Sequence, residues 1–230
     1  MKLLAFDTST LALSVAYTDG DIWITREEPP GQTHSQKLIP IIDQVLAEAR
    51  ASLGDLDALA FGAGPGSFTG VRIACGVAQG LGLGAEVPLV PVCTLEALAQ
   101  SAHDVHGATR VYACLDARMR EVYVAMYSLD SGRWIVETEP AVLHPGNARA
   151  PHGDGWFGAG DGFSAYPDLA ASLRLAHADA TLLPHARSIA RIAMPRVAAG
   201  ETVDAAHALP VYVRHRVALT TAERDAGARL

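Results

Sequence analysis

Residues 62–73 combine the residue types best suited to holding an anion. The segment reads Gly-Ala-Gly-Pro-Gly-Ser-Phe-Thr-Gly-Val-Arg-Ile and joins an apolar run to a stretch with helical spacing. Glycines let the chain turn tightly and let another group approach its backbone, and Ser67 stands where a helix N-cap would. Because the first N–H groups of a helix point outward, this junction predicts a loop able to bind phosphate.

The segment completes none of the established motifs for this chemistry. A P-loop needs a lysine after its last glycine, and Lys2 and Lys37 are the only lysines of the chain. The spacing G-x-G-x-x-x-G also lacks the acidic residue that ends the second strand of a dinucleotide site. A nucleophile elbow requires glycine where Pro65 stands. Two interpretations stay open: a vestigial phosphate loop, or a turn whose glycines serve packing alone.

A second polar segment, residues 7–10, follows the first predicted strand and could complete such a loop. Asp7 could order a metal-bound water or simply accept hydrogen bonds that close the loop. Arg72 predicts an acidic or phosphate partner, or an ion pair within the chain, and Arg118 is the other arginine singled out. The candidate vestigial nucleotide or phosphate loop comprises Asp7, Ser9, Thr10, Gly64, Gly66, Ser67 and Arg72.

The helix predicted after this loop carries glycines at intervals of four, at Gly76, Gly80 and Gly84. Each glycine inside a helix costs roughly 1 kcal/mol relative to alanine. A ridge of small residues lets another backbone come close, and Val77 and Leu81 add apolar contacts beside it. The ridge therefore predicts packing either on the chain's own sheet or against a helix of another chain.

The elements that must position these residues follow the order β-β-β-α-β-α-β-α over residues 1–104, which predicts an α/β fold with a mixed sheet and helices on its faces. The pattern restarts with strands at 110–115 and 121–128. Residues 145–162 are rich in glycine and proline and predict loops. A helix at 186–200 and a short strand at 211–213 follow. We expect one domain over 1–104 and a smaller one over 105–230, whose C-terminal segment is a candidate to pack back on the first.

Composition limits the function classes. The chain has 230 residues, of which 50% are hydrophobic and 19% charged, as in globular proteins. Its net charge of −7 disfavours a protein that binds nucleic acid on its own. The 3 cysteines show no C-x-x-C spacing, which favours a reducing compartment without disulfide or zinc framework. Without a signal peptide pattern or a membrane-spanning stretch, we expect a cytoplasmic protein.

Four stretches resemble the TsaB (YeaZ) family of the bacterial tRNA threonylcarbamoyladenosine system. They are Asp-Thr-Ser-Thr at 7–10, the Gly-Pro-Gly-Ser-Phe-Thr-Gly segment within 64–73, Asp-Ala-Arg at 116–118 with Glu-Val-Tyr at 121–123, and Pro-Val-Tyr-Val-Arg at 210–214. The resemblance runs nearly end to end. It implies two lobes of the actin/Hsp70/sugar-kinase type, with an RNase H-like core and a reduced second lobe.

For function, the resemblance implies a non-catalytic scaffold that binds and activates a TsaD-like transferase together with a TsaE-like ATPase. Metal and ATP would sit on those partners, tRNA would be reached only through the complex, and this chain would supply no catalytic residue, metal ligand or cofactor. The pairing would use the first-lobe helices. The expected interface residues are Leu38, Ile42, Val45, Gly76, Val77, Gly80, Leu81 and Gly84.

The alternative function is a free-standing ATPase or small-molecule kinase that uses Asp7 and the glycine loop. A module that binds RNA alone is the third hypothesis, and the acidic charge disfavours it. Both a monomer and a homodimer are compatible with the sequence when the partner is absent.

Overall fold

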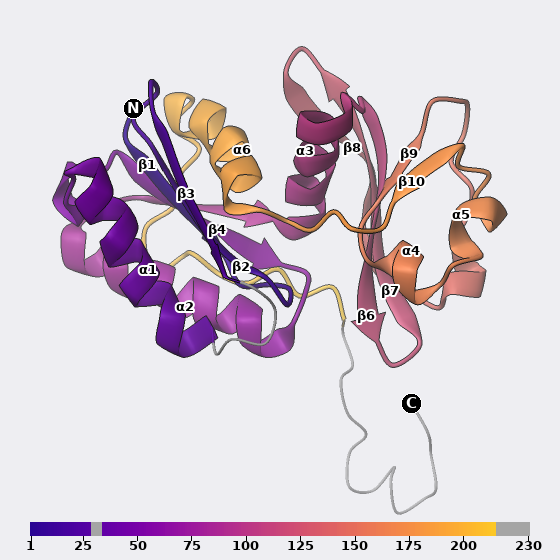
Figure 1. The fold of residues 1–230 in the computed structure, drawn as a ribbon, viewed down its shortest axis with the longest axis horizontal. Coiled ribbons are helices and arrows are strands. Elements are labelled where there is room, and N and C mark those ends of the chain that lie inside the picture. The colour runs from indigo at the N-terminus through magenta and orange to yellow at the C-terminus, as the bar shows by residue number, and fades with distance from the viewer. Residues whose placement is uncertain (29–33, 215–230) are drawn as a thin grey trace, which may run out of the picture.

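The computed structural model describes residues 1–28 and 34–214, which form two lobes, each built on a 5-stranded sheet (Figure 1). In the first lobe the strand order is β3-β2-β1-β4-β5, with β2 antiparallel and β4 parallel to β1. The strands are β1 (Leu3–Asp7), β2 (Leu13–Thr18), β3 (Trp23–Glu28), β4 (Ala58–Gly64) and β5 (Leu89–Cys93). Strands β1, β2 and β4 are buried along their whole length, because helices cover both faces of the sheet.

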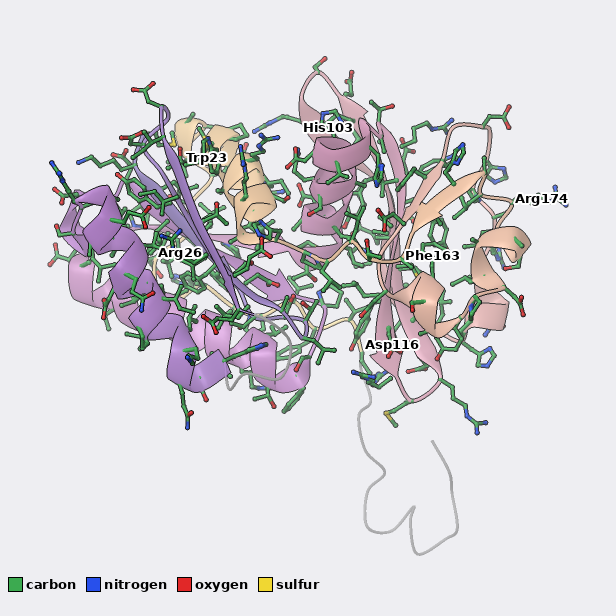
Figure 2. The ribbon with its side chains drawn as sticks, viewed as in Figure 1. Trp23, Arg26, His103, Asp116, Phe163 and Arg174 are labelled. Atoms are coloured by element: carbon green, nitrogen blue, oxygen red, sulfur yellow. The ribbon has the colours of Figure 1, made fainter. Side chains whose placement is uncertain are left out.

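Helices α1 (His34–Ala49) and α2 (Phe68–Ala85) cover one face of this sheet, and a short 3₁₀ turn (Leu53–Asp55) separates α1 from β4. Helix α6 (Ala186–Ala198), from the C-terminal part of the chain, covers the other face. Its apolar side chains Ile189, Ile192 and Ala193 pack with residues of β1, β4 and β5. Two guanidinium groups of α6 also lie over the ring of Trp23, a β3 residue that is labelled in Figure 2. The guanidinium of Arg187 is 5.0 Å from the centroid of this ring.

The second sheet has the order β10-β9-β6-β7-β8. Its elements are β6 (Arg110–Arg118), β7 (Glu121–Asp130), β8 (Arg133–Leu143), β9 (Phe157–Ala159), β10 (His177–Asp179), a 3₁₀ turn (Pro145–Asn147), α4 (Gly162–Ala165) and α5 (Leu169–Ser172). The long hairpins β6–β7 and β7–β8 form most of it, and short β9 and β10 pair parallel beside β6. The predicted α/β class, with a mixed sheet in each of two lobes, is confirmed.

Three details of the sequence prediction were wrong or incomplete. The edge strand β8 was not predicted, since most of its residues are exposed and carry no alternating pattern. Strand β9 lies within the stretch expected to be loop and has only 3 residues. Residues 211–213 form no strand; Val211 donates one backbone hydrogen bond to the Ala63 oxygen at 2.7 Å without a continuing ladder.

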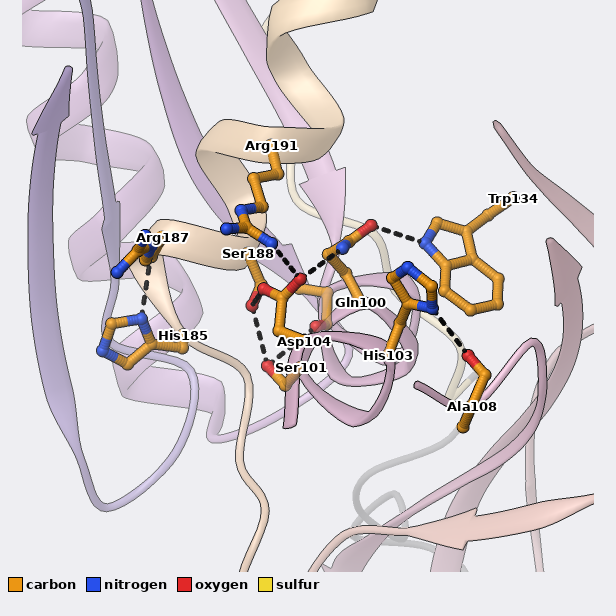
Figure 3. A network of polar contacts seen from close by, with 11 residues as sticks. Gln100, Ser101, His103, Asp104, Ala108, Trp134, His185, Arg187, Ser188 and Arg191 are labelled. Atoms are coloured by element: carbon orange, nitrogen blue, oxygen red, sulfur yellow. Dashed lines mark hydrogen bonds and ion pairs between the residues drawn. The ribbon is translucent and has the colours of Figure 1, made fainter. Parts of the chain in front are cut away.

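Helix α3 (Thr94–His106) lies where the two lobes meet and is held by a polar network (Figure 3). Gln100 accepts a hydrogen bond from the Trp134 indole of β8 at 2.9 Å. Ser101 is bonded to Ser188 of α6 at 2.9 Å, and Asp104 pairs with Arg191 of the same helix. Helix α3 also contributes apolar side chains to the hydrophobic core of the second lobe. The polar network therefore connects α6, which packs on the first sheet, through α3 to β8 of the second sheet.

None of the helices in the described residues combines the length and the apolar character that crossing a bilayer requires.

Candidate functional site

The glycine loop and residues 7–10 interlock at the end of β1 and β4. Ser67 is the N-cap of α2, as predicted, and its hydroxyl accepts the Gly70 amide at 3.3 Å. The Ser67 amide donates to the Ser9 carbonyl oxygen at 2.7 Å. From the other loop, the Thr8 hydroxyl donates to the Gly70 carbonyl oxygen at 2.6 Å. The two loops therefore hold each other through one backbone–backbone hydrogen bond and one from a side chain to the backbone.

The glycines of the loop are required by this close contact. A methyl group added at Gly70 would lie 1.9 Å from the Thr8 carbonyl oxygen, and one at Gly66 would lie 2.4 Å from the Ser9 carbonyl oxygen. At Gly62 it would lie 1.9 Å from a carboxylate oxygen of Asp7. All three distances are far below van der Waals contact. Close packing between the loops is therefore sufficient to explain why glycine stands at these positions.

Asp7 lies inside this interlocked region and is 1% exposed. Its Oδ2 accepts a hydrogen bond from the Ser9 hydroxyl at 2.9 Å, whereas Oδ1 has no partner among the described residues. Burial raises the pKa of the Asp7 carboxyl to about 7, against the opposing effect of the Ser9 hydrogen bonds. Burial therefore favours the protonated, neutral form of the Asp7 carboxyl over the ionised form.

We expect the stability of the natural chain to depend on pH through Asp7, and the Asp7→Asn variant to lack this dependence. The pKa of Asp7 in the folded chain, about 7, lies above the unfolded value of 3.8. The contribution of Asp7 to the free energy of unfolding is therefore fully present below pH 3.8 and is lost as the pH rises to 7. A pKa difference of about three corresponds to about 4 kcal/mol. Relative to the natural chain, Asp7→Asn should thus gain stability between pH 4 and pH 8 in denaturant titrations.

The control for this experiment is Asp43→Asn, at an exposed position of α1. This variant removes the same carboxylate charge at the surface, so it separates the effect of burial from the loss of one negative charge. An Asp7→Asn stability curve that runs parallel to the natural one would show that Asp7 is ionised in the folded protein throughout, against the effect of its burial.

A cavity of about 820 Å³ opens between the lobes beside this region. The first lobe contributes Ser9, Thr10, Gly66, Ser67 and Arg72 to its wall, so most of the predicted loop residues meet here. Gly64 and Asp7 lie behind that wall, buried. The second lobe contributes residues that sequence reasoning left without a role: Leu115, Asp116, Met119, Tyr123 and Asp161, together with Tyr212 and Arg214 from the C-terminal segment. The motifs at 116–118, 121–123 and 210–214 included Asp116, Tyr123, Tyr212 and Arg214, whereas no signal in the sequence indicated the other three, which lie far from the glycine loop along the chain.

The two arginines singled out from the sequence have different surroundings. The Arg72 guanidinium lies over the Phe68 ring at 3.3 Å and the Tyr212 ring at 4.9 Å, and it donates to the Phe68 carbonyl oxygen. Within residues 1–28 and 34–214 it forms no ion pair. Arg118 pairs with Asp116 at 3.2 Å and is largely exposed. Both arginines line the cavity, and the guanidinium of Arg72 is held there against two aromatic rings.

The outer face of α2 carries the glycine ridge. Gly76, Gly80 and Gly84 are exposed, and a methyl group added at any of them would meet open space. Leu83 beside the ridge is 75% exposed, and Val77 and Leu81 are half-buried. No side chain of this chain's described residues therefore explains the glycines of the ridge.

The α1 residues assigned to the partner interface need correction. Leu38, Ile42 and Val45 are at most 1% exposed and belong to the core between α1, α2 and the sheet. The apolar stripe of α1 covers the chain's own sheet, so these side chains reach no partner in this conformation. The sequence showed a stripe broad enough for two faces, and burial decided which part faces inward.

In the part of the chain that the structure describes, no group of three or more histidine, cysteine, aspartate or glutamate side chains could hold a metal ion. Burial raises the pKa of each cysteine thiol above its ordinary value, at Cys75, Cys93 and Cys114. A raised pKa keeps a thiol protonated and a poor nucleophile.

Comparisons with known proteins match this architecture over most of the chain. The family model described as "TsaD: tRNA N6-adenosine threonylcarbamoyltransferase" matches residues 28–213. The chain is 46% identical over 224 residues to the tRNA threonylcarbamoyladenosine biosynthesis protein TsaB of Escherichia coli, covering 95% of this chain and 96% of that protein. It is 37% identical to the protein of the same name from Haemophilus influenzae, over 94% of this chain and 95% of that one.

Among solved structures, YeaZ from Pseudomonas aeruginosa superimposes with a TM-score of 0.85 at 43% identity, covering 92% of this chain and 99% of that chain. A second Pseudomonas aeruginosa structure, described as an uncharacterized protein with similarity to peptidase YEAZ, gives a TM-score of 0.88 at 44% identity over 93% of this chain and 99% of that one.

Proposed function

This chain belongs to the TsaB (YeaZ) family and acts in tRNA threonylcarbamoyladenosine biosynthesis, and we propose that it does so as a non-catalytic scaffold subunit of the modifying enzyme. In this role it binds a TsaD-like transferase through the outer face of α2. A TsaE-like ATPase joins the pair, and tRNA is bound only by the assembled complex. The assembly works in the cytoplasm.

The observation that carries this proposal is the open glycine ridge. Three glycines on one face of an 18-residue helix cost about 3 kcal/mol relative to alanine, and the described residues give no internal packing reason for them. Two helices that pack closely lie 8–10 Å apart, and small residues allow the shorter distance. The exposed Leu83 and half-buried Val77 beside the ridge supply apolar area for a second helix.

The chemistry then belongs to the partners. Asp7, the carboxyl that a nucleotide-using chain of this fold would need, is buried behind the interlocked loops, and its burial favours the neutral form. The Ser67 amide at the start of α2 is already bonded to Ser9. These features favour metal and ATP on the partner subunits, with no cofactor in this chain, over the alternative of a free-standing ATPase or small-molecule kinase.

Light scattering on a sizing column tests the proposal, with the chain alone and mixed with the TsaD-like paralogue of its own cell. A shared peak at the mass of a heterodimer is the expected result. Separate peaks at micromolar concentrations would contradict the scaffold role. The mass of the isolated chain in the same experiment distinguishes a monomer from a homodimer.

ATP hydrolysis by the purified chain tests the alternative. The scaffold proposal expects no turnover above buffer. Turnover that disappears in Asp7→Ala, with a circular dichroism spectrum like that of the natural chain, would support the free-standing enzyme instead.

A further inference from the structure

Two different kinds of contact join the two lobes. The first is the network around α3 and α6, in which Trp134 of β8 donates a hydrogen bond to Gln100 (Figure 3). The second is an irregular segment, residues 208–214, which we name the strap. It passes from the first lobe to the second, as the yellow trace in Figure 1 shows, and its residues 211–214 line the cavity.

The strap is tied to the first lobe at three points. The Ala208 carbonyl oxygen accepts hydrogen bonds from the Cys75 thiol at 3.2 Å and the Gln79 amide at 2.9 Å. The Val211 amide donates to the Ala63 carbonyl oxygen at 2.7 Å. The Tyr212 ring then lies under the Arg72 guanidinium. Since residues 72, 75 and 79 fall on one side of α2, the strap follows that helix beside its glycine ridge.

At its other end the strap is hydrogen-bonded, through Arg214, to both sides of the turn between β6 and β7. One Arg214 nitrogen, Nη2, donates to the Ala117 carbonyl oxygen at 3.0 Å and to the Glu121 carboxylate at 2.5 Å. The same guanidinium lies 5.9 Å from the centroid of the Tyr123 ring. One side chain thus joins the last residues of β6 to the first of β7.

The turn between β6 and β7 is strained. Arg118, Met119 and Arg120 have φ angles of 59°, 52° and 63°, which place three consecutive non-glycine residues in the left-handed region. This region is unfavourable for residues that carry a Cβ atom. A strained conformation persists only when its surroundings hold it. Arg214 holds both ends of the turn, and the Asp116 carboxylate, which accepts the Arg118 amide at 3.0 Å, supports it from within.

The Arg214 side chain that contacts the turn also has a polar atom without a hydrogen-bond partner. Nε of Arg214 is buried and has no partner among the described residues. A buried donor without an acceptor has lost its hydrogen bonds to water without replacing them, which destabilises the conformation that buries it. The unpaired Nε and the left-handed backbone of the turn therefore both oppose the hydrogen bonds by which Arg214 holds this arrangement.

From these contacts we infer that the strap is a latch, meaning a segment that holds the two lobes closed over the cavity and can be released. The contacts that break on release are those of Arg214, and the α3–α6 network is the hinge about which the lobes separate. Release of Arg214 frees the β6–β7 turn, lets Val211 leave Ala63, and widens the cavity while the network of Figure 3 stays intact. Because the strap is tied to α2, movement of that helix and closure of the lobes are coupled. The inference concerns the single chain and does not depend on the proposed partner.

Hydrogen exchange on the isolated chain tests the latch with the variant Arg214→Met. This substitution keeps an apolar side chain and removes the guanidinium that binds the β6–β7 turn. We expect the amides of Val211 and of residues 117–121 to exchange at least 10-fold faster, while amides of β1 and β4 keep their rates. The matched control is Arg120→Met, an exposed arginine of the same turn. Unchanged rates at Val211 and in the turn would overturn the inference, as would a uniform acceleration that included β1.

Small-angle scattering supplies the second readout, since a released latch lets the lobes separate. The radius of gyration should increase in Arg214→Met and not in Arg120→Met. Tyr212→Ala, which removes the ring under Arg72, should also increase it and should accelerate exchange at Val211. A radius of gyration unchanged in both latch variants would show that the lobes are held by the α3–α6 side alone, and the latch would be rejected.

Discussion

Gly80→Leu should abolish binding to the TsaD-like paralogue while leaving this chain folded. A leucine on the open ridge of α2 projects into the space that a partner helix needs, so the two backbones cannot reach close packing distance. We expect the dissociation constant to rise at least 100-fold, which is about 2.7 kcal/mol. Calorimetric titration of the variant with the paralogue measures this loss.

The folded state of Gly80→Leu should not suffer, because leucine is a better helix former than glycine by somewhat less than 1 kcal/mol. Its melting temperature should match or slightly exceed that of the natural chain. Ala198→Leu is the matched control, since it adds the same side chain at an exposed position of α6, on the opposite face of the sheet. Full affinity in Gly80→Leu, or an equal loss in Ala198→Leu, would remove the ridge as the binding face.

Gly70→Ala and Gly76→Ala should change stability in opposite directions, although both replace a glycine of α2 by alanine. The new methyl group at position 70 meets the Thr8 carbonyl oxygen at 1.9 Å, where backbone must move to relieve the clash. Overpacking of this kind costs about 2–3 kcal/mol. At position 76 the methyl group meets open space, so only the gain in helix propensity of about 1 kcal/mol is left.

Thermal unfolding of the two variants provides the measurement. For a chain of this size, about 1 kcal/mol shifts the melting temperature by roughly 2–4 °C. Gly70→Ala should therefore melt about 5–10 °C lower than the natural chain, and Gly76→Ala about 2–4 °C higher. A small effect in Gly70→Ala would mean that the loops at 7–10 and 62–70 are not interlocked as described.

Much of the first lobe could be predicted because its signals are local. The apolar runs of β1 and β4, the Ser67 cap and the spacing of the glycines in α2 are short-range patterns, and the structure confirms the strands and the cap. The exposed strand β8 escaped prediction for the complementary reason. With most of its residues at the surface, it has no periodic burial to reveal it.

What the sequence by itself determined is the family, the α/β class and the presence of a glycine ridge and a glycine loop. Only the tertiary structure decided what those glycines face: at Gly70 a carbonyl of the chain itself, at Gly80 open space. It likewise buried Leu38, placed α6 on the first sheet and brought Arg214 to the β6–β7 turn. The physical reason is that spacing along the chain defines a face of a helix or strand, whereas the group that covers this face comes from distant residues, through packing that no local pattern encodes.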